Sequence, residues 1–332
     1  MLNVQFVNKT TQAIMSLGIP TYLTGMARGL LGREPEIQLR HNRRKALKEA
    51  DLVITAGVPC DFRLNYGSHI RSKTYLIGIN LSQHDLKLNR KPNFAIHADP
   101  GDFLRQLANQ WQIKERWQDW GKRLVKQDKQ RTAEIVQQSS RSTNKINPLD
   151  LFQQLDPILA DNAIVVADGG DFVATASYII KPAKPLSWLD PGVFGTLGVG
   201  AGFALAAKLT YPEKPVWILY GDGALGYSIA EFDTFVRHGI AIIGLVGNDA
   251  SWGQVARDQI EILKDPIATK LQHSDYHQVV KGFGAHGLLL KDTDLIKETL
   301  LEAMKLASES KTPVLINAIL SKSDFRKGSI SM

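Results

Sequence analysis

Short apolar runs alternate with segments of helical period along most of the chain. The strand-like runs lie at residues 52–56, 74–79, 163–167, 216–220, 242–246, 287–290 and 313–320. The helices are expected over 99–107, from about residue 198, and over 228–237 and 295–307. Alternation of this kind predicts an α/β fold with parallel, doubly wound sheets.

A polar stretch rich in Lys, Arg and Gln interrupts this alternation between residues 111 and 144. Directly after it, Asn147 and Pro148 offer a helix N-cap and a proline at the first helical position, which together indicate the opening of a new domain. We therefore expect a doubly wound domain over 1–115, a polar linker over 116–145 and a second doubly wound domain over 146–332. A length of 332 residues fits two domains.

Composition narrows the classes of protein. Hydrophobic residues make up 44% and charged residues 22%, which excludes a disordered or fibrous chain. Cys60 is the only cysteine, so neither an internal disulfide nor a cysteine-based zinc site can form.

The run 40–48 is strongly basic, and we interpret it as the solvated face of a helix, with contact to a phosphate-bearing nucleotide or coenzyme A as the alternative. No motif supports nucleic acid binding.

Membrane and secretion signals are not expected in these residues. The longest apolar runs, such as 201–207 and 216–220, are far shorter than the roughly 18 residues that a membrane-spanning helix needs. The first residues also lack a charged segment followed by an apolar core, which a secretory signal has.

The triplet Gly221-Asp222-Gly223 directly follows the strand-like run 216–220. In open α/β sheets, ligands bind beyond the carboxyl ends of the strands. The two glycines permit close approach of backbone N–H groups to a diphosphate, and the helix expected after them would add its positive N-terminal end. Asp222 offers a hard oxygen ligand to a divalent cation. A surface turn is the alternative for an isolated triplet of this kind.

Asn248 and Asp249 follow the next strand, 26 and 27 positions after Asp222. A strand-helix-strand unit spans roughly 30 residues, so the two strand ends should be neighbours. Asn248 or Asp249 would give a second side-chain oxygen, and a backbone carbonyl at Ala250 or Ser251 a third. Oxygen ligands of this kind, with diphosphate and water, suit Mg²⁺. The sequence thus predicts a magnesium-bound diphosphate between these strands.

Several longer motifs carry a family resemblance. They occupy residues 25–32, 60–64, 168–172, 188–192, 194–202 and 231–238. With the triplet and the Asn-Asp pair, they make the chain resemble thiamine-diphosphate enzymes of the acetolactate synthase superfamily, and within it the acetolactate-synthase-like 2-hydroxyacyl-CoA lyases of animals. The resemblance covers nearly the whole chain after about Leu17.

The resemblance implies roles for further residues. Residues Gly195, Thr196 and Leu197 would hold the aminopyrimidine of thiamine diphosphate, with Leu197 as the wedge that bends the cofactor; a glycine-rich helix start packed on the sheet is the alternative. The diphosphate would contact Gly170, Asp171, Phe172, Gly221, Asp222, Gly223 and Ala224. The metal ligands would come from Asp222, Asn248, Asp249 and Ser251. The family often has Asn-Asn at 248–249, with the second position as ligand, so the choice between Asn248 and Asp249 stays open.

The first domain resembles the middle domain of this superfamily. That domain holds FAD in acetolactate synthases and an adenine nucleotide or coenzyme A in acyl-CoA lyases. Gly57, Arg63 and Asp99 occupy typical turn positions there, but their side chains do not choose between FAD, ADP and coenzyme A. A purely structural middle domain is an equal alternative.

The resemblance implies cleavage of a 2-hydroxyacyl-CoA to a shortened aldehyde and formyl-CoA, as in fatty acid α-oxidation. Acetolactate synthesis from a 2-oxo acid, and a non-catalytic fragment, are the alternatives. The family's catalytic glutamate lies in a separate N-terminal domain of a neighbouring subunit, and no catalytic residue is identified in this chain. We therefore expect a homo-oligomer or a subunit that supplies that domain, and for full-length relatives a place at the endoplasmic reticulum membrane.

Overall fold

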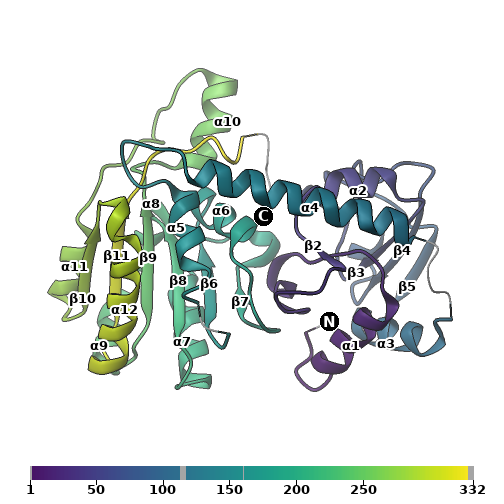
Figure 1. Ribbon diagram of the computed structural model, residues 1–332, viewed down its shortest axis with the longest axis horizontal. Coiled ribbons are helices and arrows are strands. Elements are labelled where there is room, and N and C mark those ends of the chain that lie inside the picture. Colours follow the sequence, from purple (N-terminus) through teal and green to yellow (C-terminus); the bar gives the residue numbers. More distant parts are fainter. Residues whose placement is uncertain (1, 113–116, 160, 328–332) are drawn as a thin grey trace. The chain divides into compact units, whose positions relative to one another are not determined.

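The computed structural model describes residues 2–112, 117–159 and 161–327 (Figure 1). The chain divides into two compact units, Met1–Glu134 and Ile135–Ser329. Both contain parallel sheets with helices between the strands, so the α/β class predicted from the sequence is confirmed.

The first unit is built on a small parallel sheet. Its strands, in spatial order, are β3 (Leu52–Ala56), β4 (Tyr75–Asn80) and β5 (Phe94–His97). A separate parallel pair consists of β1 (Thr21–Tyr22) and β2 (Gln38–Leu39). The helices are α1 (Val7–Leu17), η1 (Gly25–Ala27), α2 (Arg43–Glu49), η2 (Phe62–Leu64), η3 (Asp85–Lys87) and α3 (Pro100–Gln110). Helix α1 packs on α3 through a cluster that includes Ile14, Leu17 and Leu104.

The polar stretch between the expected domains forms a helix, α4 (Gln118–Ser139). The division between the two units falls inside this helix, between Glu134 and Ile135, which lies within the range 116–145 expected as the linker. The reason is a sparse set of anchors in an otherwise polar sequence. Leu124 is buried in a cluster with Leu39, and Asp128 accepts hydrogen bonds from the backbone N–H groups of Arg40 and His41.

The second unit holds a six-stranded, wholly parallel sheet. Its strands, in spatial order, are β10 (His286–Leu290), β11 (Val314–Ile319), β9 (Ile243–Asn248), β8 (Val216–Gly221), β6 (Ile164–Asp168) and β7 (Trp188–Leu189). The helices are α5 (Pro148–Leu155), α6 (Asp171–Ile179), η4 (Gly192–Phe194), α7 (Gly200–Thr210), α8 (Asp222–Leu225), α9 (Glu231–Arg237), α10 (Gly253–Leu263), α11 (Tyr276–Gly282), η5 (Thr293–Leu295) and α12 (Ile296–Ser310).

The helix start predicted at Asn147 and Pro148 is confirmed. The side chain of Asn147 caps α5 by accepting a hydrogen bond of 3.0 Å from the backbone N–H of Leu149, and Pro148 is the first helical residue. The same Asn147 amide donates to the carbonyls of Gln138 and Ser139 at the end of α4. One side chain therefore fixes both the end of α4 and the start of α5.

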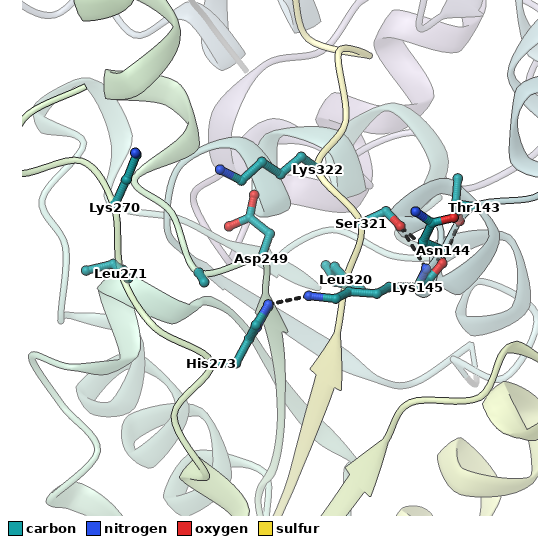
Figure 2. A pocket seen from close by; sticks show the side chains of 11 residues that line it. Thr143, Asn144, Lys145, Asp249, Lys270, Leu271, His273, Leu320, Ser321 and Lys322 are labelled. Atoms are coloured by element: carbon teal, nitrogen blue, oxygen red, sulfur yellow. Dashed lines mark hydrogen bonds between the residues drawn. The ribbon is translucent and has the colours of Figure 1, made fainter. Parts of the chain in front are cut away.

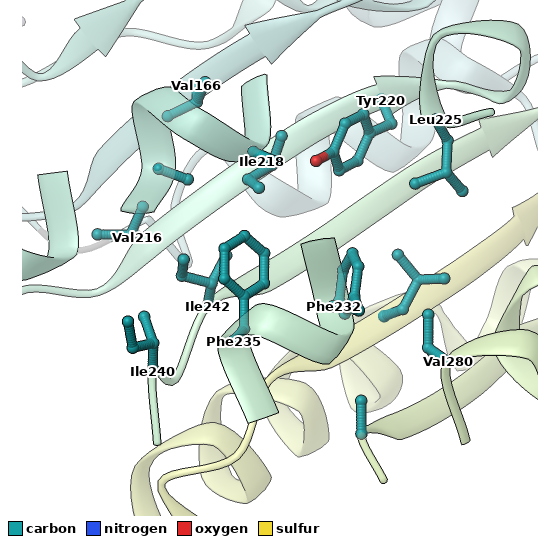
Figure 3. Packing of buried hydrophobic residues seen from close by; sticks show 14 of the residues in the cluster. Val166, Val216, Ile218, Tyr220, Leu225, Phe232, Phe235, Ile240, Ile242 and Val280 are labelled. Carbon is teal, nitrogen blue, oxygen red and sulfur yellow. The ribbon is translucent and has the colours of Figure 1, made fainter. Parts of the chain in front are cut away.

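The core of this unit lies on both faces of the sheet. Because side chains alternate along a strand, Val166, Ile218 and Tyr220 point to one face (Figure 3). Helix α9 covers them with Phe232 and Phe235, which are fully buried. The central strands β8 and β9 are buried on both sides, which explains their nearly unbroken apolar sequences. Such a sheet leaves its polar chemistry to the strand ends.

Candidate functional site

The carboxyl ends of β6, β8 and β9 lie at the same edge of the sheet and carry most of the predicted site residues. In the register of these neighbouring strands, Asp168 lies opposite Tyr220, and Gly221 lies opposite Gly247. The strands therefore end at nearly the same level. The loops that leave them, 169–171, 222–224 and 249–251, are brought together as a parallel sheet requires.

Asp222 is a buried carboxylate held by backbone N–H groups. Its residue is 3% exposed. Its Oδ1 accepts from the backbone N–H of Gly223 at 2.8 Å, and its Oδ2 from that of Ser251 at 3.3 Å. Burial raises the pKa of Asp222 to about 6, although these hydrogen bonds oppose the shift. A buried carboxylate without a cation partner is costly, so this position favours a bound metal ion.

Two glycines at this edge are required by close packing. A Cβ atom on Gly223 would lie 2.5 Å from the ring of Trp252, and a Cβ atom on Gly169 would lie 2.8 Å from the backbone nitrogen of Gly221. The backbones of these loops can therefore approach one another, and a ligand, only without side chains. Close packing therefore explains why glycine occupies these positions.

Asp249 and the turn after it face Asp222. Burial, followed by the nearby Asp222 carboxylate, raises the pKa of Asp249 to about 7. The next residue, Ala250, has φ of 55°, a left-handed conformation that is strained for a residue with a side chain. Its carbonyl accepts from the N–H of Leu271 at 2.9 Å, which leaves the carbonyl of Ser251 as the better candidate ligand. The turn is strained where a metal ligand is expected.

Asn248 has different surroundings from its neighbour. It is fully buried, and its amide donates to the side chain of Asn317 at 3.1 Å and to the carbonyl of Ser274 at 3.2 Å. Its Oδ1 lies 3.1 Å from Nδ1 of His273. All the polar atoms of this side chain are thus engaged within the protein. Of the two candidates that the sequence left open, the structure favours Asp249 as the metal ligand.

One expectation about this edge is wrong. The helix after the triplet is α8, a single turn of four residues, and the next helix, α9, starts only at Glu231. The helix expected over 228–237 is therefore shorter and starts later, because residues 226–230 form turns in which Ser228 is buried. A strong helix dipole at Gly223 and Ala224 is not available, and the backbone N–H groups themselves must attract a diphosphate.

The glycine-rich segment 195–200 is fastened to the end of β6. The carboxylate of Asp168, which is fully buried, accepts from the N–H groups of Gly198 at 2.9 Å and Gly200 at 2.8 Å. A Cβ atom on Gly198 would lie 2.6 Å from Cβ of Tyr227. Close packing therefore accounts for these two glycines.

The earlier part of the same segment is different. Gly195 has φ of 57°, and no described atom lies within 4 Å of the position that its Cβ would take. Gly195 and Thr196 are exposed and Leu197 is partly buried. Packing against the sheet does not explain these three residues, which supports the reading of them as ligand contacts.

The loop after β6 has a mixed role. Asp171 forms an ion pair of 2.6 Å with Arg257 of α10, and Phe172 is buried against Phe152, with ring centroids 4.6 Å apart. A Cβ atom on Gly247 would strike the Phe172 ring at 2.3 Å. The side chains of Asp171 and Phe172 thus position the loop, and Gly170 presents backbone to the site.

Sequence reasoning missed the residues that surround the site. They are Trp252, which covers Gly223; Tyr276, whose hydroxyl donates to the carbonyl of Asp222 at 3.4 Å; and Arg257. Asp168 was noted only as part of a motif. The contact between Trp252 and Gly223 joins residues 29 positions apart, so it leaves no periodic pattern in the sequence. The one signal that could have pointed to Trp252 is its position directly after the proposed metal loop.

The residues present fit a magnesium-bound diphosphate. Two carboxylates with raised pKa values, Asp222 and Asp249, would be neutralised together by a divalent cation. Over the described ranges, no group of three or more His, Cys, Asp or Glu side chains is placed to hold a metal ion. A cation here would take its remaining ligands from backbone carbonyls, diphosphate and water, which is how proteins usually bind Mg²⁺.

The strand ends of the first unit are closed by internal contacts. Arg63 pairs with Asp61 at 2.7 Å, Asp99 caps α3 by accepting from the N–H of Asp102 at 2.7 Å, and Gly57 packs near Pro100. A pocket at the ends of β3 and β4 has a volume of about 10 Å³, room for one water molecule. The residues singled out from the sequence here have structural roles.

Comparison with known proteins agrees with this division of the chain. Residues 168–318 match the C-terminal TPP binding domain of thiamine pyrophosphate enzymes, and residues 4–107 match their central domain. None of the helices in the described part of the chain is long and apolar enough to cross a membrane.

Curated relatives match along nearly the whole chain. It is 46% identical to 2-hydroxyacyl-CoA lyase 2 of Mus musculus, with 98% of this chain and 52% of the relative covered. It is 43% identical to 2-hydroxyacyl-CoA lyase 2 of Caenorhabditis elegans, with 97% and 52% covered, and 32% identical to acetolactate synthase large subunit IlvG of Mycobacterium tuberculosis, with 91% and 54% covered. The chain spans about half the length of these relatives. It belongs to the thiamine pyrophosphate enzymes, and it contains their central domain and their C-terminal, cofactor-binding domain.

Proposed function

We propose that this chain is the cofactor-binding part of a carbon–carbon lyase that depends on thiamine diphosphate and Mg²⁺ and acts on 2-hydroxyacyl-CoA. The observation that carries the proposal is the pair of carboxylates, Asp222 and Asp249, at the ends of two adjacent strands, each with a raised pKa. The likeness to 2-hydroxyacyl-CoA lyase 2 supports the choice of substrate class. The reaction would convert R–CH(OH)–CO–S–CoA to R–CHO and H–CO–S–CoA.

Each part of the edge would contribute one task. Asp222, Asp249 and the carbonyl of Ser251 would hold Mg²⁺, while the backbone of Gly170, Gly221, Gly223 and Ala224 would face the diphosphate. Thiamine diphosphate, when bound, supplies an electron sink for breaking a bond next to a carbonyl.

The ring of the cofactor would rest on a separate segment. Gly195, Thr196 and Leu197 would contact the aminopyrimidine, and Leu197 would set the bend of the cofactor. Asp168 would keep this segment in place through its two backbone hydrogen bonds. Trp252 would exclude water above Gly223, because its ring already lies over that position.

Product analysis tests the substrate class. The chain is incubated with thiamine diphosphate, Mg²⁺ and a full-length relative's N-terminal domain, and either a 2-hydroxyacyl-CoA or pyruvate is added. Release of aldehyde and formyl-CoA from the first supports the proposal. Formation of acetolactate from pyruvate would support the condensation instead, which the likeness to an acetolactate synthase subunit favours.

The proposal includes a partner and a location. The 332 residues alone should bind cofactor without appreciable turnover, and a neighbouring subunit should restore turnover by supplying the glutamate. Sedimentation of the loaded protein would show whether a homo-oligomer forms. Efficient turnover by the chain alone would refute the need for a partner.

Placement at the endoplasmic reticulum membrane is part of the same proposal, and fractionation of cells that express the tagged protein tests it.

A further inference from the structure

A second pocket lies beside the carboxylate pair, on the other side of Asp249. It has a volume of about 620 Å³, within the range of small-molecule sites. Asp249 and Ala250 form one wall, and the remaining walls come from the three segments 143–145, 270–273 and 320–322 (Figure 2). Gly221, Asp222 and Gly223 do not line it. The pocket is therefore adjacent to the proposed cofactor site without being the same space.

The lining is strongly basic. Lys145, Lys270 and Lys322 supply three ammonium groups, and Asp249 is the one carboxylate among the lining residues. Among the residues that the structure describes, no side chain forms an ion pair with Lys270 or Lys322. Figure 2 shows the Lys322 side chain beside the Asp249 carboxylate. If Asp249 coordinates the metal ion, the pocket retains three cations and no anion of its own.

A chain of hydrogen bonds that starts at the surface and runs inward contacts one of these cations. An ammonium group only donates, so Nε2 of His273 must accept from Lys145, and Nδ1 must carry the ring hydrogen. That Nδ1–H then donates to Oδ1 of Asn248. These partners correspond to one tautomer of the His273 ring.

The chain continues into the core of the sheet. The amide of Asn248 donates to Asn317, whose own amide donates toward Nδ1 of His277 and to the carbonyl of Ser274. Asn248 and Asn317 are both fully buried. The series thus links the Lys145 side chain at the pocket to the buried amides of Asn248 and Asn317.

The remaining lining matches a ligand with an apolar part. Leu271 and Leu320 contribute apolar surface, and Thr143 and Ser321 contribute hydroxyl groups. Lysine acts as a point charge toward phosphate, and three lysines around one hollow favour a multiply charged anion over a single carboxylate.

We infer that this pocket is a second phosphate site, which binds a phosphate-bearing small molecule through Lys145, Lys270 and Lys322 while the carboxylate pair holds the cofactor. Two sources share this chemistry. One is the phosphate groups of an acyl-CoA substrate, a choice that rests on the proposed function. The other is a free phosphate, which would not depend on it.

Calorimetry on the full 332-residue chain, saturated with thiamine diphosphate and Mg²⁺, tests the inference. Coenzyme A and inorganic phosphate are titrated separately. We expect the double variant Lys270→Ala/Lys322→Ala to bind the anion up to about 25-fold more weakly, since each exposed charge pair contributes up to about fivefold. Lys145→Ala should weaken it further, and Lys145→Arg should restore most of the loss. The control Lys305→Ala removes an exposed lysine of α12 and should bind like the unchanged chain.

The results separate the sources and the proposals. Lysine-dependent binding that is tighter for coenzyme A than for phosphate assigns the site to the substrate, and equal affinities assign it to free phosphate. Lysine-independent binding, no binding, or competition between the anion and thiamine diphosphate would overturn the inference. Cofactor binding is measured in the same samples before the anion is added. Loss of cofactor binding with the lysine-dependent anion site intact would count against the proposed function alone.

Discussion

The larger parallel sheets of the two units differ in how the carboxylates at their strand ends are paired. At the strand ends of the first unit, Asp61 pairs with Arg63 and Asp99 caps a helix, so each carboxylate has a partner. At the strand ends of the second unit, Asp222 and Asp249 face each other, and the pKa of each is raised. The same fold class thus produces a closed edge in one unit and a charged one in the other. The site depends on two carboxylates with raised pKa values at adjacent strand ends, and the sheet alone does not create it.

Removal of Asp222 should have the largest effect on cofactor affinity. Asp222→Ala should abolish Mg²⁺-dependent binding of thiamine diphosphate, because a metal ligand and the anchor of the loop at Ser251 are lost together. Calorimetry measures this directly. The matched control is Asp61→Ala in the first unit, which removes a carboxylate of the closed edge and should leave cofactor affinity unchanged. Unaltered affinity in Asp222→Ala would remove the metal from this position.

Asp249 and Asn248 should respond differently to the same truncation. Asp249→Ala should weaken cofactor binding by at least about tenfold, as expected for loss of a charged ligand, and should not lower the melting temperature of the metal-free protein. Asn248→Ala should lower the melting temperature, since the buried Asn317 then loses a partner at a cost of about 1–3 kcal/mol. Thermal unfolding and calorimetry on both variants decide the matter. A larger loss of affinity in Asn248→Ala would move the ligand to that residue.

Cofactor affinity should depend on pH because both carboxylates hold protons more tightly than usual. Their pKa values are about 6 for Asp222 and about 7 for Asp249 in the metal-free protein, above the ordinary value. Metal binding needs them ionised, so affinity should rise between pH 5 and 8, by about tenfold per pH unit for each proton released.

The stability of the metal-free protein should change in the opposite sense. Raised pKa values stabilise the fold fully at a pH below the ordinary pKa of aspartate, and this contribution is lost as the pH rises through 6 to 7. Melting temperatures across this range, with Asp249→Asn as the control that removes one titrating group, measure the effect. A cofactor affinity that stays constant between pH 5 and 8 would contradict the raised pKa values of the two carboxylates.

The smallest effect on affinity is expected at Leu197. Leu197→Ala should change the affinity for thiamine diphosphate by less than about tenfold, because the side chain touches no charge, but it should lower kcat in the enzyme assembled with its partner subunit. Leu209→Ala, which truncates an exposed leucine of α7, is the matched control. Normal kcat in Leu197→Ala would take this residue out of the site.

The sequence predicts the elements and the ligands better than it predicts their surroundings. Strand β3 has the bounds expected from its apolar run, and Asn147 caps α5, because both depend on local patterns. The bounds of helix α4 within the expected linker could not be predicted, since two or three anchors in a polar helix leave no apolar stripe. Trp252 over Gly223, and His273 on Asn248, are contacts between distant segments, which neither periodicity nor spacing reveals.

The most direct test of the carboxylate pair is anomalous diffraction from crystals of the chain grown with thiamine diphosphate and Mn²⁺ in place of Mg²⁺. The account predicts one metal peak between the carboxylates of Asp222 and Asp249, at coordination distance from an oxygen of each and from the carbonyl of Ser251, with the diphosphate over Gly221 and Gly223. A metal peak elsewhere, or a bound diphosphate that leaves Asp222 without a metal ion, would contradict it.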